Sequence, residues 1–293
     1  MFTPENVPII IPCSHRPEFL IECLNHLNDC DLINEFTVWF SIDSKFEFDS
    51  NKSKDDHYCV LDYVSYWNSS KETEYYIHID NENPIFNSVG AINNILDKTG
   101  AEAFIYIEED VIVSRCFLRF CLDALNFYKD NQNVLMIAGH NENSSDKTLP
   151  AVAELSEKVT CSVLLGVAGW ANKWKWIKDN LKSYCEDPNW IISELKKSVL
   201  PEVNCHVRPD GTMRNRAGGG LVTANMIING QVCLVPDIAL ANHIGFYGWH
   251  IPKETADPND IIAFSKTFHK DNEYSSDFLE IGKGEIMEAF GFA

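Results

Sequence analysis

The chain has 293 residues, a formal net charge of −19 and a sequence pI near 4.8. Apolar residues make up 45% of it and aromatic residues 12%, which is enough for a buried core and excludes a disordered chain. The acidic excess argues against nucleic acid and anionic membrane as partners, because both bind clustered positive charge.

No apolar run approaches the ~18 residues of a membrane span, and the N-terminus has no basic segment before its apolar stretch. The ten cysteines form no CxxC pair, and several lie inside apolar runs, where a free cysteine packs as a small hydrophobe. We therefore expect no membrane span, no zinc site and a reduced, cytoplasmic setting, while the even number of cysteines leaves disulfides open.

In the first part of the chain, apolar strand patterns alternate with helical ones. The predicted strands are 7–11, 36–42, 74–79 and 104–107, the predicted helices are 18–27, 58–68 and 86–96, and the polar segment 44–56 is a predicted loop. This alternation predicts βαβ units in an α/β fold, with a mostly parallel sheet flanked by helices. Right-handed crossovers then bring Ser14, Arg16, Asp43 and the acidic end of the fourth strand to one edge.

The fourth strand ends in the sequence FIYIEED, in which an apolar run is followed by Glu108, Glu109 and Asp110. We expect a buried strand whose tip reaches solvent at the sheet edge where α/β proteins bind ligands. The three carboxylates repel one another, and a divalent cation would compensate them best. Their oxygens suit Mg²⁺ or Mn²⁺ bridging to a substrate phosphate. The alternative is an acidic strand–loop junction without a ligand.

The second part of the chain continues with mixed patterns. Helices are predicted over 117–128, 173–183 and 190–197, strands over 134–138 and 231–235, a polar loop over 141–148 and a turn over 186–189. The segment 214–220, RNRAGGG, is expected to be a mobile loop because its glycines disfavour regular structure.

Four segments, in this order, resemble GT-A glycosyltransferases. They are PIIIPCSHRPEFLIECLNHL, IEEDVIVSRCFLRFCLDAL, LMIAGHNENS followed by VLLGVAGWANKWKW, and CHVRPDGTMR. The resemblance is greatest to the N-acetylglucosaminyltransferase I and protein O-mannose N-acetylglucosaminyltransferase group and to family 2-like transferases. It implies a Rossmann-like GT-A fold and a metal-dependent, inverting transfer of a sugar from a nucleotide-diphosphosugar, with a UDP-sugar favoured, to a glycan hydroxyl.

The resemblance also implies an organisation for the chain. A single catalytic domain would cover 1–293, with a nucleotide-binding half (1–115), an acceptor and catalytic half (116–250) and a C-terminal tail (251–293). The animal members of this group carry an N-terminal membrane anchor and a stem, whereas the first strand here begins within a few residues of Met1. We therefore expect either a natural catalytic core that works in a cytoplasm or a trimmed piece of a longer enzyme, and the methionine at position 1 favours the former.

By resemblance, Asp110 coordinates Mn²⁺ or Mg²⁺ on the donor diphosphate, and His250 is a second metal or phosphate ligand, ahead of His243. Glu109 would face the ribose or the donor sugar, although the family usually has aspartate there. The other implied nucleotide- or donor-binding residues are Pro12, Ser14, Arg16, Asp43, Glu108, Trp170 and Arg214. Arg214 and Arg216 beside the glycines are predicted to form either a lid on the diphosphate or an ordinary surface loop.

Transfer needs a general base, since a sugar hydroxyl is a poor nucleophile at neutral pH. By resemblance the base is Glu194, with Asp187 and Glu186 as runners-up and a helix-surface carboxylate as the alternative. Of Trp170, Trp174 and Trp176, one is expected to line the site, because tryptophans at helical spacing are more often buried in a core.

Two other functions remain open. A retaining transferase or a sugar nucleotidyltransferase would share the fold, but the latter normally has a glycine-rich basic loop after the first strand, and CSHRPEF has no glycine. A non-catalytic glycan-binding module would keep the fold without the chemistry.

Overall fold

The computed structural model describes residues 1–43, 51–78, 84–141, 148, 150–153, 155–158, 164–195, 218–248, 253, 255–259, 261 and 265–274. The strands are β1 (Ile9–Cys13), β2 (Thr37–Asp43), β3 (Glu72–His78), β4 (Ala103–Tyr106), β5 (Val111–Val113), β6 (Val134–Ala138), β7 (Val152–Ala153), β8 (Leu155–Lys158), β9 (Val167–Trp170), β10 (Val232–Pro236), β11 (Ala241–His243) and β12 (Glu273–Tyr274). The helices are η1 (Pro4–Asn6), α1 (Pro17–Asn28), η2 (Ile33–Glu35), α2 (Asn51–Tyr66), α3 (Pro84–Thr99), α4 (Phe117–Tyr128), α5 (Ala171–Glu186), η3 (Pro188–Ile191), α6 (Ile192–Leu195) and α8 (Gly218–Asn229).

The main sheet has eight strands in the order β3-β2-β1-β4-β9-β6-β10-β8. Strands β3, β2, β1 and β4 are parallel neighbours, and so are β6 and β10. Strand β9 is antiparallel to both β4 and β6, so these two strands run in the same direction. The predicted α/β architecture, a mixed and mostly parallel sheet flanked by helices, is confirmed.

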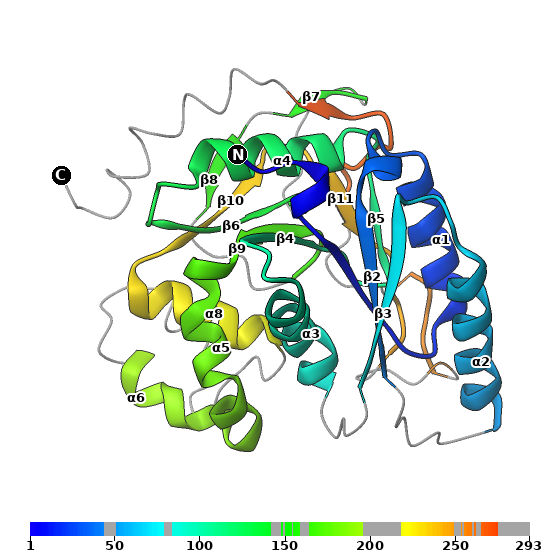
Figure 1. The fold of residues 1–293 in the computed structure, drawn as a ribbon, viewed down its shortest axis with the longest axis horizontal. Coiled ribbons are helices and arrows are strands. Elements are labelled where there is room, and N and C mark those ends of the chain that lie inside the picture. Colours follow the sequence, from blue (N-terminus) through cyan, green and yellow to red (C-terminus); the bar gives the residue numbers. More distant parts are fainter. Residues whose placement is uncertain are drawn as a thin grey trace.

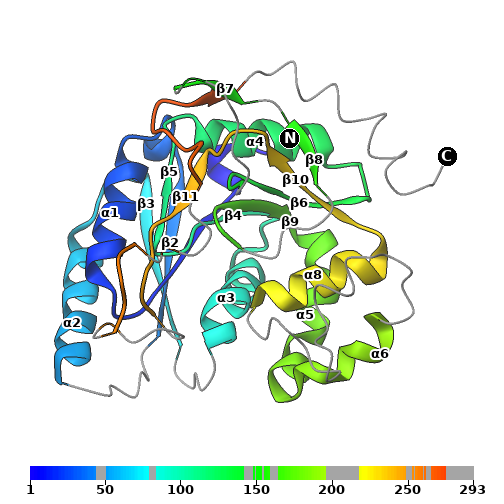
Figure 2. The same ribbon diagram turned by 180° about the vertical axis from the view of Figure 1, so that it is seen from behind.

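Helices cover both faces of the sheet (Figures 1 and 2). Helices α1, α2 and α4 pack on one face, and α3, α5, α6 and α8 pack on the other. Side chains along a strand alternate between faces, so Ile9 and Ile11 of β1 join the first core and Ile10 joins the second. Burial on both faces explains why β1 is a continuous apolar run in the sequence.

Helix α2 begins earlier than its sequence predicts. It starts at Asn51, so the loop prediction for 51–56 is wrong. Val60 and Val64 are buried against the sheet face that carries α1. Packing of these later positions stabilises the polar turns before them, which have no apolar pattern of their own.

The loop prediction for Gly218–Gly220 is also wrong, since these glycines form the first turn of α8. A Cβ atom on Gly218 would lie 2.6 Å from Val89 Cγ2 and 3.2 Å from Ser88 Oγ of α3. The close contact between the two helices requires a residue without a side chain at this position. Packing therefore overrides the low helix propensity of glycine.

Strand β9 was not predicted, although it is central in the sheet. It has only four residues, and Gly169 pairs with Phe104 of β4. A Cβ atom on Gly169 would lie 2.9 Å from Phe104 Cζ, so the glycine makes room for the phenylalanine ring. A short run that contains glycine carries no strand signal in the sequence.

The ammonium group of Lys173 joins α5 to the end of α4. Its Nζ donates hydrogen bonds to the carbonyl oxygens of Tyr128 (3.0 Å), Asn131 (2.7 Å) and Val134 (3.0 Å). The same Nζ lies 3.5 Å from the centre of the Trp170 ring. A cation at a helix C-terminus also interacts favourably with the helix dipole.

We expect Lys173→Met to lower the free energy of unfolding by about 3 kcal/mol, because charged hydrogen bonds to buried carbonyls are lost. Lys175→Met on the same helix is the matched control. Lys175 pairs with Asp179 at the surface, so its loss should cost less than about 1 kcal/mol. Urea unfolding of both variants tests this, and equal effects would contradict a structural role for Lys173.

The described cysteines, eight in number, are all free thiols. Within the same described ranges, no helix is long and apolar enough to cross a bilayer.

Candidate functional site

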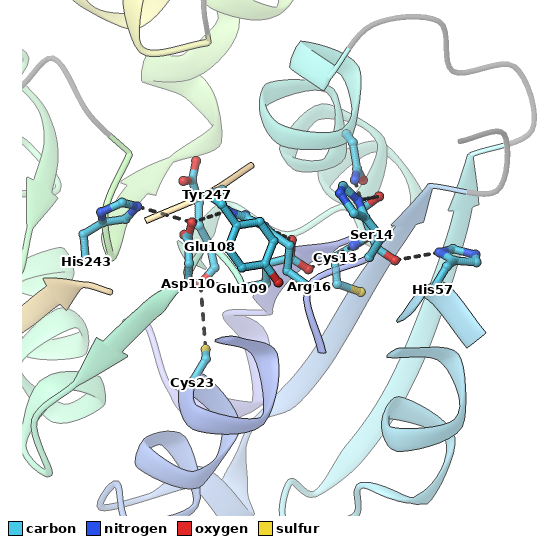
Figure 3. A network of polar contacts seen from close by, with 12 residues as sticks. Cys13, Ser14, Arg16, Cys23, His57, Glu108, Glu109, Asp110, His243 and Tyr247 are labelled. Atoms are coloured by element: carbon cyan, nitrogen blue, oxygen red, sulfur yellow. Dashed lines mark hydrogen bonds and ion pairs between the residues drawn. The ribbon is translucent and has the colours of Figure 1, made fainter. Parts of the chain in front are cut away.

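The carboxyl edge of the sheet brings together most of the polar residues predicted to meet there (Figure 3). Ser14 and Arg16 follow β1, and Asp43 is the last residue of β2. Cys13 pairs in parallel with Ile42, so Ser14 and Asp43 are the next residues along two adjacent strands. The three acids follow β4 after Ile107, and β4 is the other neighbour of β1.

Arg16 is the cation that compensates the acidic residues in this structure. Its Nε donates to Glu109 Oε1 at 2.6 Å, and its Nη1 donates to Asp110 Oδ2 at 2.5 Å. The Glu109 and Asp110 side chains are 5% and 4% exposed. The prediction of a solvent-exposed strand tip is therefore wrong for these two residues, and their mutual repulsion is balanced by a side chain of the protein.

The pKa values of the acids follow from burial and from this arginine. Burial would raise the pKa of Asp110, but the Arg16 charge and the contact with His243 outweigh it and hold the pKa well below its usual range. Burial raises the pKa of Glu109, although Arg16 opposes the shift. Burial and then the charge of Asp110 raise the pKa of Glu108 to about 7, and this carboxylate accepts a hydrogen bond from the Tyr106 hydroxyl at 3.2 Å.

A C-terminal segment covers the ion pair. We call Ile244–Gly248 the IGFYG segment. The Ile244 amide donates to the Asp110 carbonyl at 2.9 Å, and Arg16 Nη1 donates to the Tyr247 carbonyl at 3.2 Å. A Cβ atom on Gly245 would lie 2.3 Å from Asp110 Oδ2, and one on Gly248 would lie 3.1 Å from Arg16 Nη1. Two glycines three residues apart therefore let the backbone lie directly on both partners of the ion pair.

Aromatic packing fixes the IGFYG segment on α1. The Phe19 ring lies 4.9 Å from the Tyr247 ring and 5.3 Å from the Phe246 ring, measured between centres. Lys253 lies 4.7 Å from the centre of the Tyr247 ring, and it forms ion pairs with Glu18 of α1 and with Asp56 of α2. The C-terminal part of the chain thereby contacts the helices that follow the first two strands.

The two oxygens of the Asp110 carboxylate have different surroundings. Its Oδ2 is held by Arg16 and lies 3.3 Å from His243 Nε2. Its Oδ1 is buried and has no hydrogen-bond partner in the described part of the chain. The described ranges contain no group of three or more His, Cys, Asp or Glu side chains arranged to hold a metal. One fixed carboxylate oxygen fits Mg²⁺ or Mn²⁺ that is bound mainly by substrate phosphates and water.

The loop after β1 is held from three directions by contacts that the sequence did not reveal. His57 Nδ1 of α2 donates to the Ser14 carbonyl at 2.6 Å, and Asn87 Nδ2 of α3 donates to the Cys13 carbonyl at 3.4 Å. The Ser14 amide donates to Glu109 Oε2 at 2.9 Å. Single polar residues inside helices carry no motif, so only the tertiary structure identifies them.

Several predicted site residues do not join this cluster. Pro12 is a buried residue of β1, paired with Ser41. Trp170 is 2% exposed and pairs with Ala103 at the start of β4, the end opposite the acids. Its indole Nε1 donates to the Leu125 carbonyl at 3.2 Å, so the ring belongs to the core under α4. Trp174 is likewise buried, against Phe104.

The candidate bases lie on the helices after β9. Asp187 is exposed, follows the last residue of α5 and accepts a hydrogen bond from the Asn189 amide at 2.9 Å. Among the described residues, no hydrogen bond or ion pair links Asp187 to the acids after β4. Glu194 lies in α6, and its side chain is outside the described part. Arg214, Arg216 and His250 also lie outside the described residues, whereas His243, the lower-ranked histidine, contacts Asp110.

No protein-family model matches the sequence, and neither does any curated protein. Among solved structures, the chain is similar to the mannosyltransferase PcManGT from Pyrobaculum calidifontis in complex with GDP-Man and Mn²⁺ (13% identity, TM-score 0.35, 47% of this chain and 36% of that one). It is also similar to S. aureus TarS 1-349 (16% identity, TM-score 0.42, 81% of this chain and 60% of that one). A third similar structure is TarS 1-349 in complex with UDP-GlcNAc (15% identity, TM-score 0.47, 84% of this chain and 60% of that one).

The first of these proteins is a mannosyltransferase, and two of the three structures contain a nucleotide-sugar, GDP-Man or UDP-GlcNAc. The chain spans 36% to 60% of the length of the proteins it matches. Likenesses of this degree carry no conclusion about a shared activity, which has to be argued from the site itself.

Proposed function

We propose that the protein is a metal-dependent glycosyltransferase that moves a sugar from a nucleotide-diphosphosugar, with a UDP-sugar favoured, to a hydroxyl of a glycan, with inversion at the anomeric carbon. The observation that carries the proposal is the cluster at the carboxyl edge of the sheet. There a carboxylate with one unpartnered, buried oxygen contacts Arg16 in the loop after β1, and the end of β2 lies on the other side of β1. This edge is the usual ligand-binding position of open α/β sheets.

The residues at this edge divide naturally among the parts of such a donor. Asp43 and the loop at Ser14 would bind the nucleoside, and Asp110 Oδ1 would bind the metal. A bound Mg²⁺ or Mn²⁺ would supply Lewis-acid stabilisation of the charge that develops on the leaving diphosphate. Arg16 and His243 orient the Asp110 carboxylate through its other oxygen, so the metal-facing oxygen keeps one direction.

The division into a nucleotide-binding half (1–115), an acceptor and catalytic half (116–250) and a tail (251–293) is part of the same proposal. Glu194, or else Asp187, is proposed as the base that takes the proton from the acceptor hydroxyl. A retaining transferase is the alternative on the same fold, and the anomeric configuration of the product, read by NMR, separates the two. A non-catalytic glycan-binding module would bind no nucleotide.

Calorimetric titration of the purified protein with UDP, GDP, CMP and TDP, each with and without Mn²⁺, tests the proposal. We expect one nucleotide to bind, and only with the metal. Binding of none under either condition would contradict the catalytic proposal and favour the glycan-binding module.

We expect Asp110→Asn to abolish metal-dependent nucleotide binding and sugar transfer, because the amide lacks the negative charge that a hard cation requires. The fold should persist, since Arg16 keeps its contact with Glu109. Asp31→Asn is the matched control, because Asp31 forms an ion pair with Arg119 at the surface and neither residue belongs to the cluster. Retention of metal-dependent binding in Asp110→Asn would contradict the assignment of Asp110.

A further inference from the structure

A second unpartnered polar atom lies at the same edge of the sheet, on His140. This residue follows β6 after Gly139. Strand β6 runs in the same direction as β4, so His140 and Asp110 both come after the C-terminal end of a strand, at the same edge of the sheet. His140 forms an isolated parallel bridge with Ala241, the first residue of β11. His243, the last residue of β11, contacts Asp110. The partners of His140 and Asp110 on β11, Ala241 and His243, are therefore only two residue steps apart, about 7 Å along the strand.

The hydrogen bond of His140 to the backbone fixes which ring nitrogen carries the proton. Nδ1 lies 3.3 Å from the carbonyl oxygen of Ala241, which can only accept, so Nδ1 is the protonated nitrogen. Burial lowers the pKa of His140 to about 4, against the opposing effect of the Ala241 hydrogen bond, so the ring is neutral at pH 7. The other nitrogen, Nε2, must then present a lone pair.

That lone pair is buried and unused. His140 is 3% exposed, and across the described residues Nε2 has no hydrogen-bond partner. An unpaired buried acceptor lowers the stability of the protein. A ligand that donates a hydrogen bond to it would remove this cost. The Nδ1 bond also orients the ring, so Nε2 is held in one direction before any ligand binds.

We propose that His140 lines the donor-sugar part of the site, where its Nε2 accepts a hydrogen bond from a hydroxyl or amide group of the sugar. This inference rests on the proposed function. The ligand chemistry follows from the lone pair, because diphosphate oxygens at neutral pH have no hydrogen to donate, whereas every hexose carries several hydroxyl groups. The position agrees with it, since the sugar is attached to the diphosphate that would lie at Asp110, and His140 bridges β11 two residues before His243, which contacts Asp110.

The experiment compares a nucleotide with its sugar conjugate. Binding of UDP and of UDP-GlcNAc, each with Mn²⁺, is measured by calorimetry for the wild type, His140→Phe and His140→Gln. If the titration with the four nucleotides shows that the protein binds one other than UDP, that nucleotide and its sugar conjugate replace UDP and UDP-GlcNAc. We expect His140→Phe to leave UDP affinity within about twofold and to weaken UDP-GlcNAc about tenfold, the effect of one lost hydrogen bond. His140→Gln should recover part of that loss, because its Oε1 can accept.

A purely structural role would give different results. Equal weakening of both ligands, together with a lower Tm of the free protein, would overturn the inference, and so would unchanged affinity for UDP-GlcNAc in His140→Phe. Absence of nucleotide binding by the wild type would instead contradict the proposed function, and this is seen before any variant is compared.

Discussion

Replacement of Arg16 by methionine is expected to lower the free energy of unfolding at pH 7 by about 4 kcal/mol, because it leaves buried carboxylates without a partner. Arg16 donates to Glu109 at 2.6 Å and to Asp110 at 2.5 Å, and both carboxylates are nearly inaccessible to water. Water cannot take over the role of the guanidinium group while the IGFYG segment lies on the pair. Urea unfolding at pH 7 measures the effect.

The pH dependence of this loss has a definite sign. In the wild type the pKa of Asp110 is lowered, so its contribution to stability is present above the unfolded-state pKa of about 3.9 and is lost as the pH falls further. Without Arg16, burial raises that pKa, so the variant should gain stability as the pH falls from neutrality toward about pH 4. The difference between variant and wild type should therefore narrow in acid.

A triple variant provides the control for the charge argument. Arg16→Met combined with Glu109→Gln and Asp110→Asn removes the cation and both anions, so no buried charge is left unpaired. It should be more stable than Arg16→Met alone. If the single variant unfolds at the wild-type urea concentration, or if its stability does not depend on pH, the ion pair does not have the role described.

Replacement of Gly245 by alanine is expected to reduce sugar transfer by about 100-fold, the effect of misplacing a reacting group by an ångström. The new Cβ atom would lie 2.3 Å from Asp110 Oδ2 and 3.0 Å from His243 Nε2, so the carboxylate or the IGFYG segment must move. Metal-dependent nucleotide binding should weaken with it, because the direction of Asp110 Oδ1 changes. Calorimetry with Mn²⁺ and the selected nucleotide, followed by a transfer or donor-hydrolysis assay, measures both effects.

Gly248→Ala is the matched control, since it adds the same methyl group three residues later in the same segment. Its Cβ atom would lie 3.1 Å from Arg16 Nη1, at the end of a long side chain that can shift by a few tenths of an ångström. We expect less than about a tenfold loss there. Equal effects of the two substitutions would mean that they act through the segment as a whole rather than through Asp110.

The contrast between α4 and α8 shows what local pattern can and cannot predict. Helix α4 was predicted with its exact bounds, because its apolar side chains recur at helical spacing and pack on one face. The first turn of α8 was missed, because three glycines favour a loop by themselves and become helical only against Val89 and Ser88 of α3. The sequence pattern around these glycines contains no information about packing against a helix that lies more than a hundred residues earlier in the chain.

For the site, the strand order and the handedness of crossovers are enough to predict the edge of the sheet at which the polar residues meet. They place Ser14, Arg16, Asp43 and the three acids there. The sequence could not determine which cation neutralises Glu109 and Asp110. The fold shows that Arg16 does so, that the IGFYG segment covers the pair, and that His243 contacts Asp110. These contacts join residues from 93 to 231 positions apart, and their energies depend on burial and direction, which are properties of the folded chain alone.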